Sequence, residues 1–312
     1  MMDYTDRHDR YLLRLISKKM WLFTEMITSN TLLNTNPQRF LNHHQSEYPV
    51  VIQLGGSNPE DLAVCTKMAE QAGYDEVNLN VGCPSDRVKS GRFGASLMAT
   101  PALVAQCVQF MQSGVNIPVS VKCRLGIDDQ DEYEHLKEFV SIVSDGGCGI
   151  FYIHARKAWL QGLSPKENRD IPPLNYEAVY KIKHDFPQLE VIINGGIKTL
   201  QASKQHLLQV DGCMIGREAY SNPYMLAEAD SDLYQLNTPP PSRMDILHQY
   251  VDYIDDEMAV GTSLTLMSRH VLGLFQGIPG AKAWRRHISE NAHKAGSDAQ
   301  LLLNAAEFIH NH

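Results

Sequence analysis

Cys83 is the residue of this sequence with the most recognisable chemistry. It follows an apolar stretch in the run Asn78-Leu79-Asn80-Val81-Gly82-Cys83-Pro84-Ser85, and Pro84 prevents a strand from continuing beyond it. A thiol with an ordinary pKa of about 8.5 is mostly protonated at neutral pH and can protonate a carbon centre. A free cysteine is more often buried filler, which is how we interpret the other five. We therefore predict that Cys83 is a general acid.

Three further polar residues lie at or near the ends of apolar runs. The Gln53 amide can donate to and accept from a planar heterocycle. Lys122 interrupts an apolar run, and a buried ammonium needs a negative partner such as a reduced flavin. His154 ends another run and could bind the heterocycle or carry a proton. Each also has a structural interpretation, as the polar end of a strand or, for Lys122, as a side chain that reaches the rim.

Two glycine segments point to a phosphate site. Asn194-Gly195-Gly196 and Gly216-Arg217 end the last two apolar runs of the alternating region. Parallel barrels commonly bind a phosphate at this place with backbone N–H groups and a helix N-terminus. Either segment alone could simply turn the chain, but the pair favours phosphate binding, with Arg217 adding positive charge.

Basic residues gather in two places although the formal net charge is −8. The overall charge argues against a general nucleic-acid binder, whereas local patches of cations beside an aromatic ring can hold single-stranded RNA. Each patch could also be a solvated surface. The two groups are Arg156, Lys157, Lys166 and Arg169 with Trp159, and Lys282, Arg285, Arg286, His287 and Lys294 with Trp284.

Alternating strand and helix patterns between residues 20 and 217 must position these side chains. A doubly wound sheet should carry a G-x-G-x-x-G turn after its first strand, and the sequence has none. A (β/α)8 barrel instead places functional residues at the ends of several strands, and this pattern fits. We count seven strands, so we expect the first of the eight to be missing from this sequence. The predicted strands are 20–26, 50–54, 76–83, 118–124, 149–155, 190–195 and 212–217.

A second region follows the barrel. Residues 236–243 contain Pro239, Pro240 and Pro241, which predict a stiff non-helical linker. Helical periodicity then covers residues 244–260, 264–276, 281–292 and 299–309. We predict a catalytic barrel at 1–235, a linker at 236–243 and a helical bundle at 244–312.

Other features narrow the class of protein. The cysteines form no C-x-x-C pair and the histidines no ligand cluster, so we expect no metal. The sequence shows no signal peptide and no apolar run long enough to span a membrane, which predicts a cytoplasmic protein. We also expect a monomer.

In these motifs the chain resembles the tRNA dihydrouridine synthases. The resemblance rests on Asn78 to Ser85, Val121-Lys122, His154 to Leu160, Ser164 to Arg169 and the two glycine segments. The runs Gly273 to Gly280 and Trp284-Arg285-Arg286 resemble the bacterial A subfamily. The match covers essentially the whole chain in order.

The resemblance implies an enzyme that uses FMN and NADPH to reduce uridine in the tRNA D-loop, at positions 20 and 20a. It implies hydride transfer from flavin N5 to uracil C6 and a proton from Cys83 to C5. The implied FMN-binding residues are Met2, Gln53, Lys122, His154, Asn194, Gly195, Gly196, Gly216 and Arg217. The implied tRNA-binding residues are Asn80, Lys166, Arg169, Arg285, Arg286 and Ile288.

Two other functions remain open at this point. A small-molecule flavin oxidoreductase on the same barrel would reduce a free heterocycle without tRNA. A tRNA-binding protein without catalysis would bind RNA in a form that lacks flavin.

Overall fold

The described residues of the computed structural model, 1–85, 91 and 93–309, form one curled parallel sheet. Its seven strands pair in chain order from β1 to β7, so the doubly wound alternative, which requires a reversal of order, is wrong. All seven predicted strands are found, with ends that differ by a few residues. The strands are β1 (Leu22–Thr28), β2 (Val50–Gly55), β3 (Glu76–Val81), β4 (Val119–Arg124), β5 (Ile150–His154), β6 (Glu190–Asn194) and β7 (Gly212–Met214).

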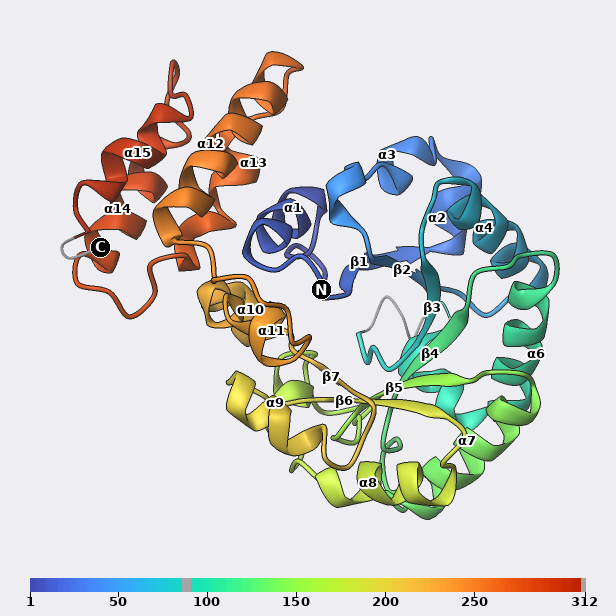
Figure 1. Cartoon of the computed structure of the whole chain (residues 1–312). Helices are drawn as coiled ribbons and strands as arrows, with labels where there is room; N and C mark the ends of the chain where they lie inside the picture. Colours follow the sequence, from blue (N-terminus) through green and yellow to red (C-terminus); the bar gives the residue numbers. More distant parts are fainter. Residues whose placement is uncertain (86–90, 92, 310–312) are drawn as a thin grey trace.

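Helices cover the outside of this sheet, as Figure 1 shows, and give a barrel-like α/β fold. Their starts follow from capping: the side chains of Asn58, Asn175 and Thr199 each accept a hydrogen bond from a backbone N–H of the following helix. The main helices of this layer are α4 (Pro59–Gln71), α6 (Pro101–Gln112), α7 (Glu134–Asp145), α8 (Tyr176–Asp185) and α9 (Leu200–His206). Shorter elements are α2 (Ser29–Asn34), α3 (Gln38–Leu41), η1 (Gln45–Glu47), η2 (Gly94–Ala99) and η3 (Glu167–Arg169).

The N-terminal residues lie between β1 and β7 (Figure 1). A Cβ atom built on Gly216, just after β7, would lie 3.5 Å from the sulfur of Met1. Among the residues that the structure describes, the sheet has seven strands, in agreement with the number counted in the sequence.

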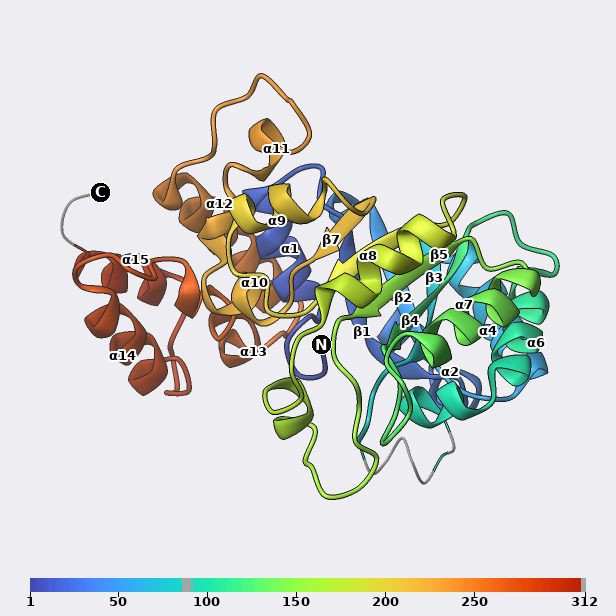
Figure 2. The ribbon, with the colours of Figure 1, turned by 90° about the horizontal axis from the view of Figure 1, so that it is seen from below.

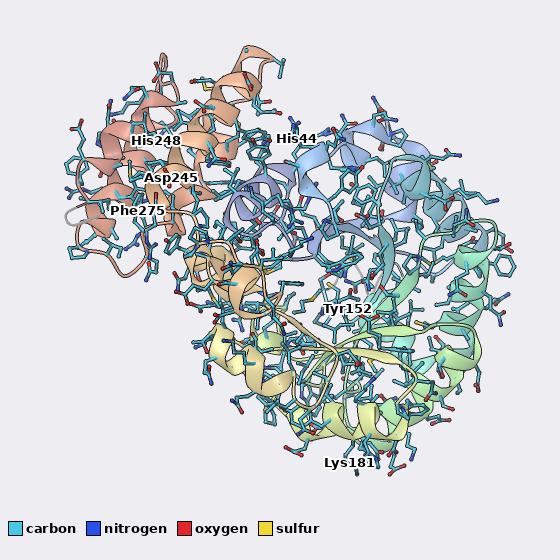
Figure 3. All side chains as sticks on the ribbon, in the orientation of Figure 1. His44, Tyr152, Lys181, Asp245, His248 and Phe275 are labelled. Carbon is cyan, nitrogen blue, oxygen red and sulfur yellow. The ribbon has the colours of Figure 1, made fainter. Side chains whose placement is uncertain are left out.

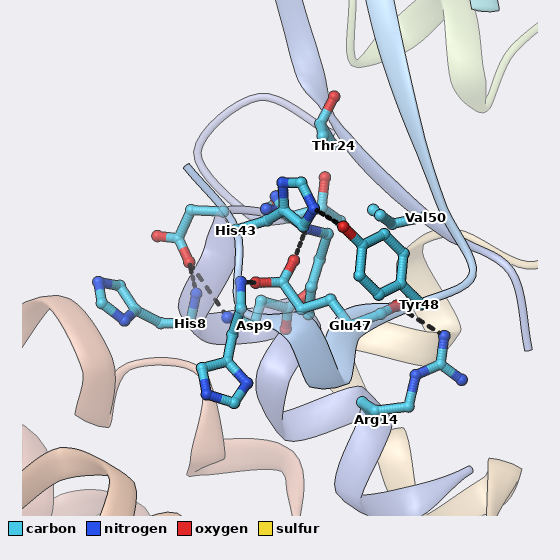
Figure 4. Close-up of polar contacts among 12 residues, drawn as sticks. His8, Asp9, Arg14, Thr24, His43, Glu47, Tyr48 and Val50 are labelled. Carbon is cyan, nitrogen blue, oxygen red and sulfur yellow. Dashed lines mark hydrogen bonds and ion pairs between the residues drawn. The ribbon is translucent and has the colours of Figure 1, made fainter. Parts of the chain in front are cut away.

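Helix α1 (Arg7–Ile16) packs beside β1, and buried polar contacts fix its last turns near the starts of β1 and β2 (Figure 4). Arg10 Nε donates to Glu47 Oε2 at 2.6 Å. Arg14 donates to the backbone oxygens of Met20, at 2.7 Å, and Pro49, at 3.2 Å, which lead into the two strands. These contacts hold α1 to the segments that begin β1 and β2.

The C-terminal helices pack together beside α1. After α10 (Arg217–Ser221) and α11 (Ala229–Asp232), residues 235–242 carry no helix or strand, as the three prolines predict. The predicted helix at 264–276 is wrong in extent, because α13 ends at Ser268 and a short 3-10 turn covers Val271–Gly273. Close packing of Gly273, whose Cβ would lie 2.6 Å from the Ser221 carbonyl oxygen, requires this bend. The helices are α12 (Arg243–Ala259), α13 (Leu264–Ser268), α14 (Ala281–Asn291) and α15 (Gln300–Ala306).

Ion pairs join α1 to these helices. Asp6 caps α1 through the backbone N–H groups of His8 and Asp9 and also accepts from Arg269, at 2.6 Å, and His270, at 3.0 Å. Arg7 donates to Glu257 of α12 at 2.9 Å. No helix in the described part of the chain is both long and apolar enough to cross a membrane.

Candidate active site

Residues from three neighbouring strands meet at the C-terminal end of the sheet. The strand register pairs His154 of β5 with Asn194 of β6, and Arg124 of β4 with His154. Lys122 Nζ donates to Asn194 Oδ1 at 3.2 Å, and Asn194 Nδ2 donates to the Met214 carbonyl of β7 at 2.8 Å. The structure therefore brings together Lys122, His154 and Asn194, which the sequence predicted as site residues on separate strands.

This group is rich in positive charge. Burial, and next the charge of Arg124, lower the pKa of Lys122 to about 8. Burial together with the charges of Arg124, Lys122, Arg156 and Arg217 holds the pKa of His154 well below its usual value, so His154 is neutral at pH 7. A neutral imidazole beside several cations suits the binding of an anion.

Glycines shape the turn after β6. Gly195 and Gly196 have φ angles of +118° and +69°, which L side chains rarely adopt. A Cβ at Gly195 would lie 2.7 Å from Cδ2 of His154, and one at Gly196 would lie 2.5 Å from Leu174. Only glycine lets His154 and Leu174 pack directly on this turn.

The second glycine segment differs from its prediction. Strand β7 ends at Met214, and Gly216 precedes α10, whose first residue is Arg217. Arg217 pairs with Asp170 at 2.7 Å and donates to the Arg169 backbone oxygen at 3.3 Å. The prediction that Gly216-Arg217 ends a strand is therefore wrong, because the strand ends at Met214, two residues before Gly216, and Arg217 begins a helix.

Met2, another predicted cofactor residue, lies at the exposed N-terminus of the chain. Its side chain is 51% exposed. The methionine beside Gly216 is Met1, whose sulfur lies 3.5 Å from the Cβ position of that glycine. The assignment of Met2 to the cofactor stays a prediction.

Cys83 lies just beyond β3, and side-chain amides hold its turn. Asn80 Oδ1 accepts the backbone N–H groups of Gly82 and Cys83 at 3.1 and 3.0 Å. Asn80 Nδ2 donates to Gln53 Oε1 of β2 at 2.7 Å. The half-buried Cys83 thiol donates to Ser85 Oγ at 3.5 Å. Gln53, Asn80 and Cys83, which the sequence predicted separately, thus form one hydrogen-bonded group.

Arg124 is a residue of this end of the sheet that the sequence reasoning missed. It is 4% exposed, and its guanidinium donates to the backbone oxygens of Gly82 at 3.2 Å, Lys157 at 3.2 Å and Asn168 at 3.0 Å. It therefore joins the turn before Cys83 to the loop after β5. Its place two residues after Lys122 was a signal, because alternate strand residues face the same side.

The loop after β5 extends from the barrel (Figure 2) and exposes two of the predicted tRNA-binding residues, Lys166 and Arg169. Buried Asn168 holds the loop, since its side chain bonds the backbone of Trp159 in both directions, at 2.7 and 2.9 Å. Lys157 lies 5.8 Å from the centre of the Trp159 ring. Cations and a ring are therefore close together here, as predicted.

The second predicted basic group lies on helix α14, where its aromatic ring is buried. Arg286 is exposed and Arg285 partly so, with its guanidinium donating to Gln276 at 2.9 Å. Trp284 is fully buried and packs edge-on against Phe275 at 4.9 Å, so it offers no ring for stacking on RNA. Ile288 is 1% exposed, because it lies one helical turn beyond Trp284 on the same inner face. The side chain of Ile288 is therefore part of the core in this structure, and its contact with tRNA stays a prediction.

Potential metal ligands do not gather in groups of three or more in the described ranges. The site is instead built from a thiol, carboxamides, cations and glycine turns. Such a set can bind a planar heterocycle and an anion and can deliver a proton.

Comparison with known proteins gives a full-length match. The family model described as dihydrouridine synthase (Dus) matches residues 1–310. The tRNA-dihydrouridine(20/20a) synthase of Vibrio vulnificus (strain CMCP6) is 58% identical over 306 residues, which are 98% of this chain and 94% of that protein. The protein of the same name from Vibrio cholerae serotype O1 is 56% identical over 98% of this chain and 93% of its own length. That from Escherichia coli (strain K12) is 53% identical over 99% and 90%. The chain belongs to the dihydrouridine synthase family.

Proposed function

We propose that this chain reduces uridine to 5,6-dihydrouridine at positions 20 and 20a of the tRNA D-loop, with FMN as cofactor and NADPH as reductant. The observation that carries the proposal is the hydrogen-bonded group of Gln53, Asn80 and Cys83 beside the cationic group around Lys122. The relatives named as tRNA-dihydrouridine(20/20a) synthases support the substrate and the positions.

FMN fits the residues present. Its phosphate is an anion, and His154, whose pKa is lowered by burial and by four nearby cations, lies against the glycine turn at Gly195-Gly196. The Nε atom of Arg156 is buried and has no hydrogen-bond partner among the described residues. Bound FMN would supply hydride from its N5 to uracil C6. The residues that would hold it are Met2, Gln53, Lys122, His154, Asn194, Gly195, Gly196, Gly216 and Arg217.

The side chains of this protein would have separate roles in the reaction. Lys122 would neutralise negative charge on the pyrimidine end of the flavin, since its ammonium is partly buried and, among the described residues, donates to the neutral amide of Asn194 alone. Cys83 would give the proton on Sγ to C5 of uracil. Asn80 and Gln53 would present amide groups to the ring of the substrate or the cofactor.

The proposed domains follow the sequence analysis: a catalytic barrel at 1–235, a linker at 236–243 and a helical RNA-binding domain at 244–312, of which residues 310–312 lie outside the described residues. Lys166 and Arg169 in the loop after β5, and Arg285 and Arg286 on α14, would contact tRNA phosphates. The target uridine must leave its stack to reach Cys83.

The test is direct. The purified chain, supplied with FMN and NADPH, is incubated with a tRNA transcript that has uridine at positions 20 and 20a, and dihydrouridine is mapped by mass spectrometry. We expect reduction at those two positions that depends on both FMN and NADPH. Reduction of a free heterocycle without tRNA would support the small-molecule oxidoreductase instead. RNA binding by a protein that does not take up FMN would support the non-catalytic alternative.

A further inference from the structure

Glu76 carries a buried carboxyl group to which no role has been assigned above. Glu76 begins β3 and is 3% exposed. It accepts a hydrogen bond from the Ser120 hydroxyl of β4 and one from the Tyr152 hydroxyl of β5 at 3.4 Å. Figure 3 places Tyr152 inside the ring of strands. Ser120 Oγ in turn accepts from Asn78 Nδ2 at 2.7 Å.

The hydrogen bonds continue from Asn78 to the catalytic end. Asn78 Oδ1 accepts from Gln53 Nε2 at 2.9 Å, and Gln53 Oε1 accepts from Asn80 Nδ2 at 2.7 Å. Asn80 Oδ1 then accepts the backbone N–H groups of Gly82 and Cys83. We call the series Glu76, Ser120, Asn78, Gln53 and Asn80 the amide relay.

Every bond of the amide relay points the same way. The single hydroxyl hydrogen of Ser120 goes to the Glu76 carboxyl group, and the Ser120 oxygen accepts from Asn78 Nδ2. Because the amide nitrogen of Asn78 donates to Ser120, its oxygen is the atom that faces Gln53 and accepts from it. In the same way, the Gln53 nitrogen donates to Asn78, so the Gln53 oxygen accepts from Asn80. A reversed amide would place two nitrogens or two oxygens against each other in a buried setting, which is costly.

The direction of these hydrogen bonds determines which amide groups remain free to bind a ligand. Gln53 and Asn80 each have a second N–H on the amide nitrogen that the relay does not use, while Asn80 keeps its oxygen on the Cys83 turn. The relay thus presents hydrogen-bond donors to a ring and fixes the backbone that carries the thiol.

We propose that Glu76 and Ser120 are positioning residues, which set the amide orientations of Gln53 and Asn80 and thereby the geometry of the Cys83 turn. This inference rests on the proposed function. Glu76 and Ser120 lie near the beginnings of β3 and β4, whereas Cys83 follows the end of β3. The inference gives these two residues a part in proton delivery through hydrogen bonds across β2, β3 and β4.

The main test uses Ser120→Ala with two readouts. The first is the single-turnover rate constant for dihydrouridine formation at saturating tRNA, which we expect to fall about tenfold or more, since small misplacements of reacting groups are costly. The tRNA dissociation constant should stay within about twofold. The second is the alkylation rate of Cys83 by iodoacetamide in FMN-free protein, followed on its peptide by mass spectrometry. We expect faster alkylation as the turn loosens, and this readout does not depend on turnover.

Two substitutions of Glu76 separate orientation from simple packing. Glu76→Gln keeps an oxygen that can accept from Ser120, so rate and alkylation should remain within about twofold of wild type. Glu76→Leu removes every acceptor and should reproduce the Ser120→Ala defect. Since the two residues act in one network, the double variant Ser120→Ala with Glu76→Leu should be no slower than the worse single variant.

Thr66→Val is the matched control. Its hydroxyl is also fully buried, but it bonds the Leu62 carbonyl within α4. We expect it to leave both readouts unchanged. A wild-type rate constant together with a wild-type alkylation rate in Ser120→Ala would overturn the proposal. A tenfold lower rate constant in Glu76→Gln with a normal alkylation rate of Cys83 would also overturn it. A wild-type protein that binds FMN but forms no dihydrouridine would instead refute the proposed function, and the alkylation series would still decide the relay.

Discussion

Asn80 Oδ1 accepts the backbone N–H of Cys83 at 3.0 Å, so the proposed proton donor is held by a side chain three residues before it. The strand β3 ends at Val81, and Gly82 gives a second N–H to the same oxygen at 3.1 Å. The thiol is therefore placed by the backbone of its own turn rather than by a partner base. A proton donor must be protonated and must lie close to the atom that it protonates. The turn fixes the place of the Cys83 thiol.

The pH dependence of stability should reflect Asp9 on α1. Burial, and next the negative charge of Asp6, raise the pKa of Asp9 to about 8. The folded protein therefore keeps a proton that the unfolded chain releases near pH 4, so the contribution of Asp9 to stability falls as the pH rises from about 4 to 8. We expect Asp9→Asn to have a higher melting temperature than wild type at pH 8 and a smaller difference at pH 5. The exposed Asp129→Asn is the control, and parallel pH curves for Asp9→Asn and wild type would contradict the account.

Asp6 should matter more for stability than a surface carboxylate. It caps α1 and accepts from Arg269 and His270, and these two hydrogen bonds join α1 to the C-terminal helices. We expect Asp6→Ala to lower the free energy of unfolding by about 2 kcal/mol or more, measured in urea. Asp6→Asn keeps an oxygen for the cap and should lose less. Equal losses in the two variants would mean that capping contributes little.

The sequence predicted the barrel-like sheet because its apolar, β-branched runs are long enough to be read directly. It missed the end of β7, since a three-residue strand followed by Gly216 leaves little pattern. It predicted Gln53 and Asn80 but not their connection, because the register that places Gln53 opposite Asn78 is a property of the folded sheet. Polar residues at alternate positions of β3, Glu76, Asn78 and Asn80, were a signal for an inward polar row.

The basic surface of α14 should bind tRNA electrostatically. We expect Arg286→Glu and Arg285→Glu each to weaken tRNA binding and to reduce the slope of log affinity against log salt by about one. Lys181→Glu is the matched control, because Lys181 lies on α8 far from the C-terminal helices (Figure 3). Fluorescence anisotropy at several salt concentrations measures the slope. Equal effects of all three substitutions would remove α14 from the proposed interface.

Ile288 should act through stability and not through RNA. Its side chain lies in the core beside Trp284, so Ile288→Ala should lower the free energy of unfolding by about 2–5 kcal/mol, and Ile288→Val by about 0.5–1.5 kcal/mol. At a temperature where both variants are folded, tRNA affinity should match wild type. A loss of affinity in Ile288→Val without a loss of stability would support the sequence-based prediction of a direct contact.

Trp284 and Ile288 also show why the α14 surface was only partly predictable. Basic residues flank both positions in the sequence, and composition alone grouped the ring with the cations. The spacing of four residues puts Trp284 and Ile288 on one face, which the neighbouring helices bury, while Arg286 lies on the other.

The most direct test of the central claim is a comparison of Cys83→Ala with wild type in single-turnover reduction of tRNA. Each protein is loaded with FMN, reduced with NADPH and mixed with the transcript, and dihydrouridine at positions 20 and 20a is measured over time. We expect Cys83→Ala to retain FMN, oxidise NADPH and bind tRNA, but to form dihydrouridine at least about a hundredfold more slowly, the loss typical of a missing general acid. An unchanged rate in Cys83→Ala would contradict the assignment of Cys83 as the proton donor.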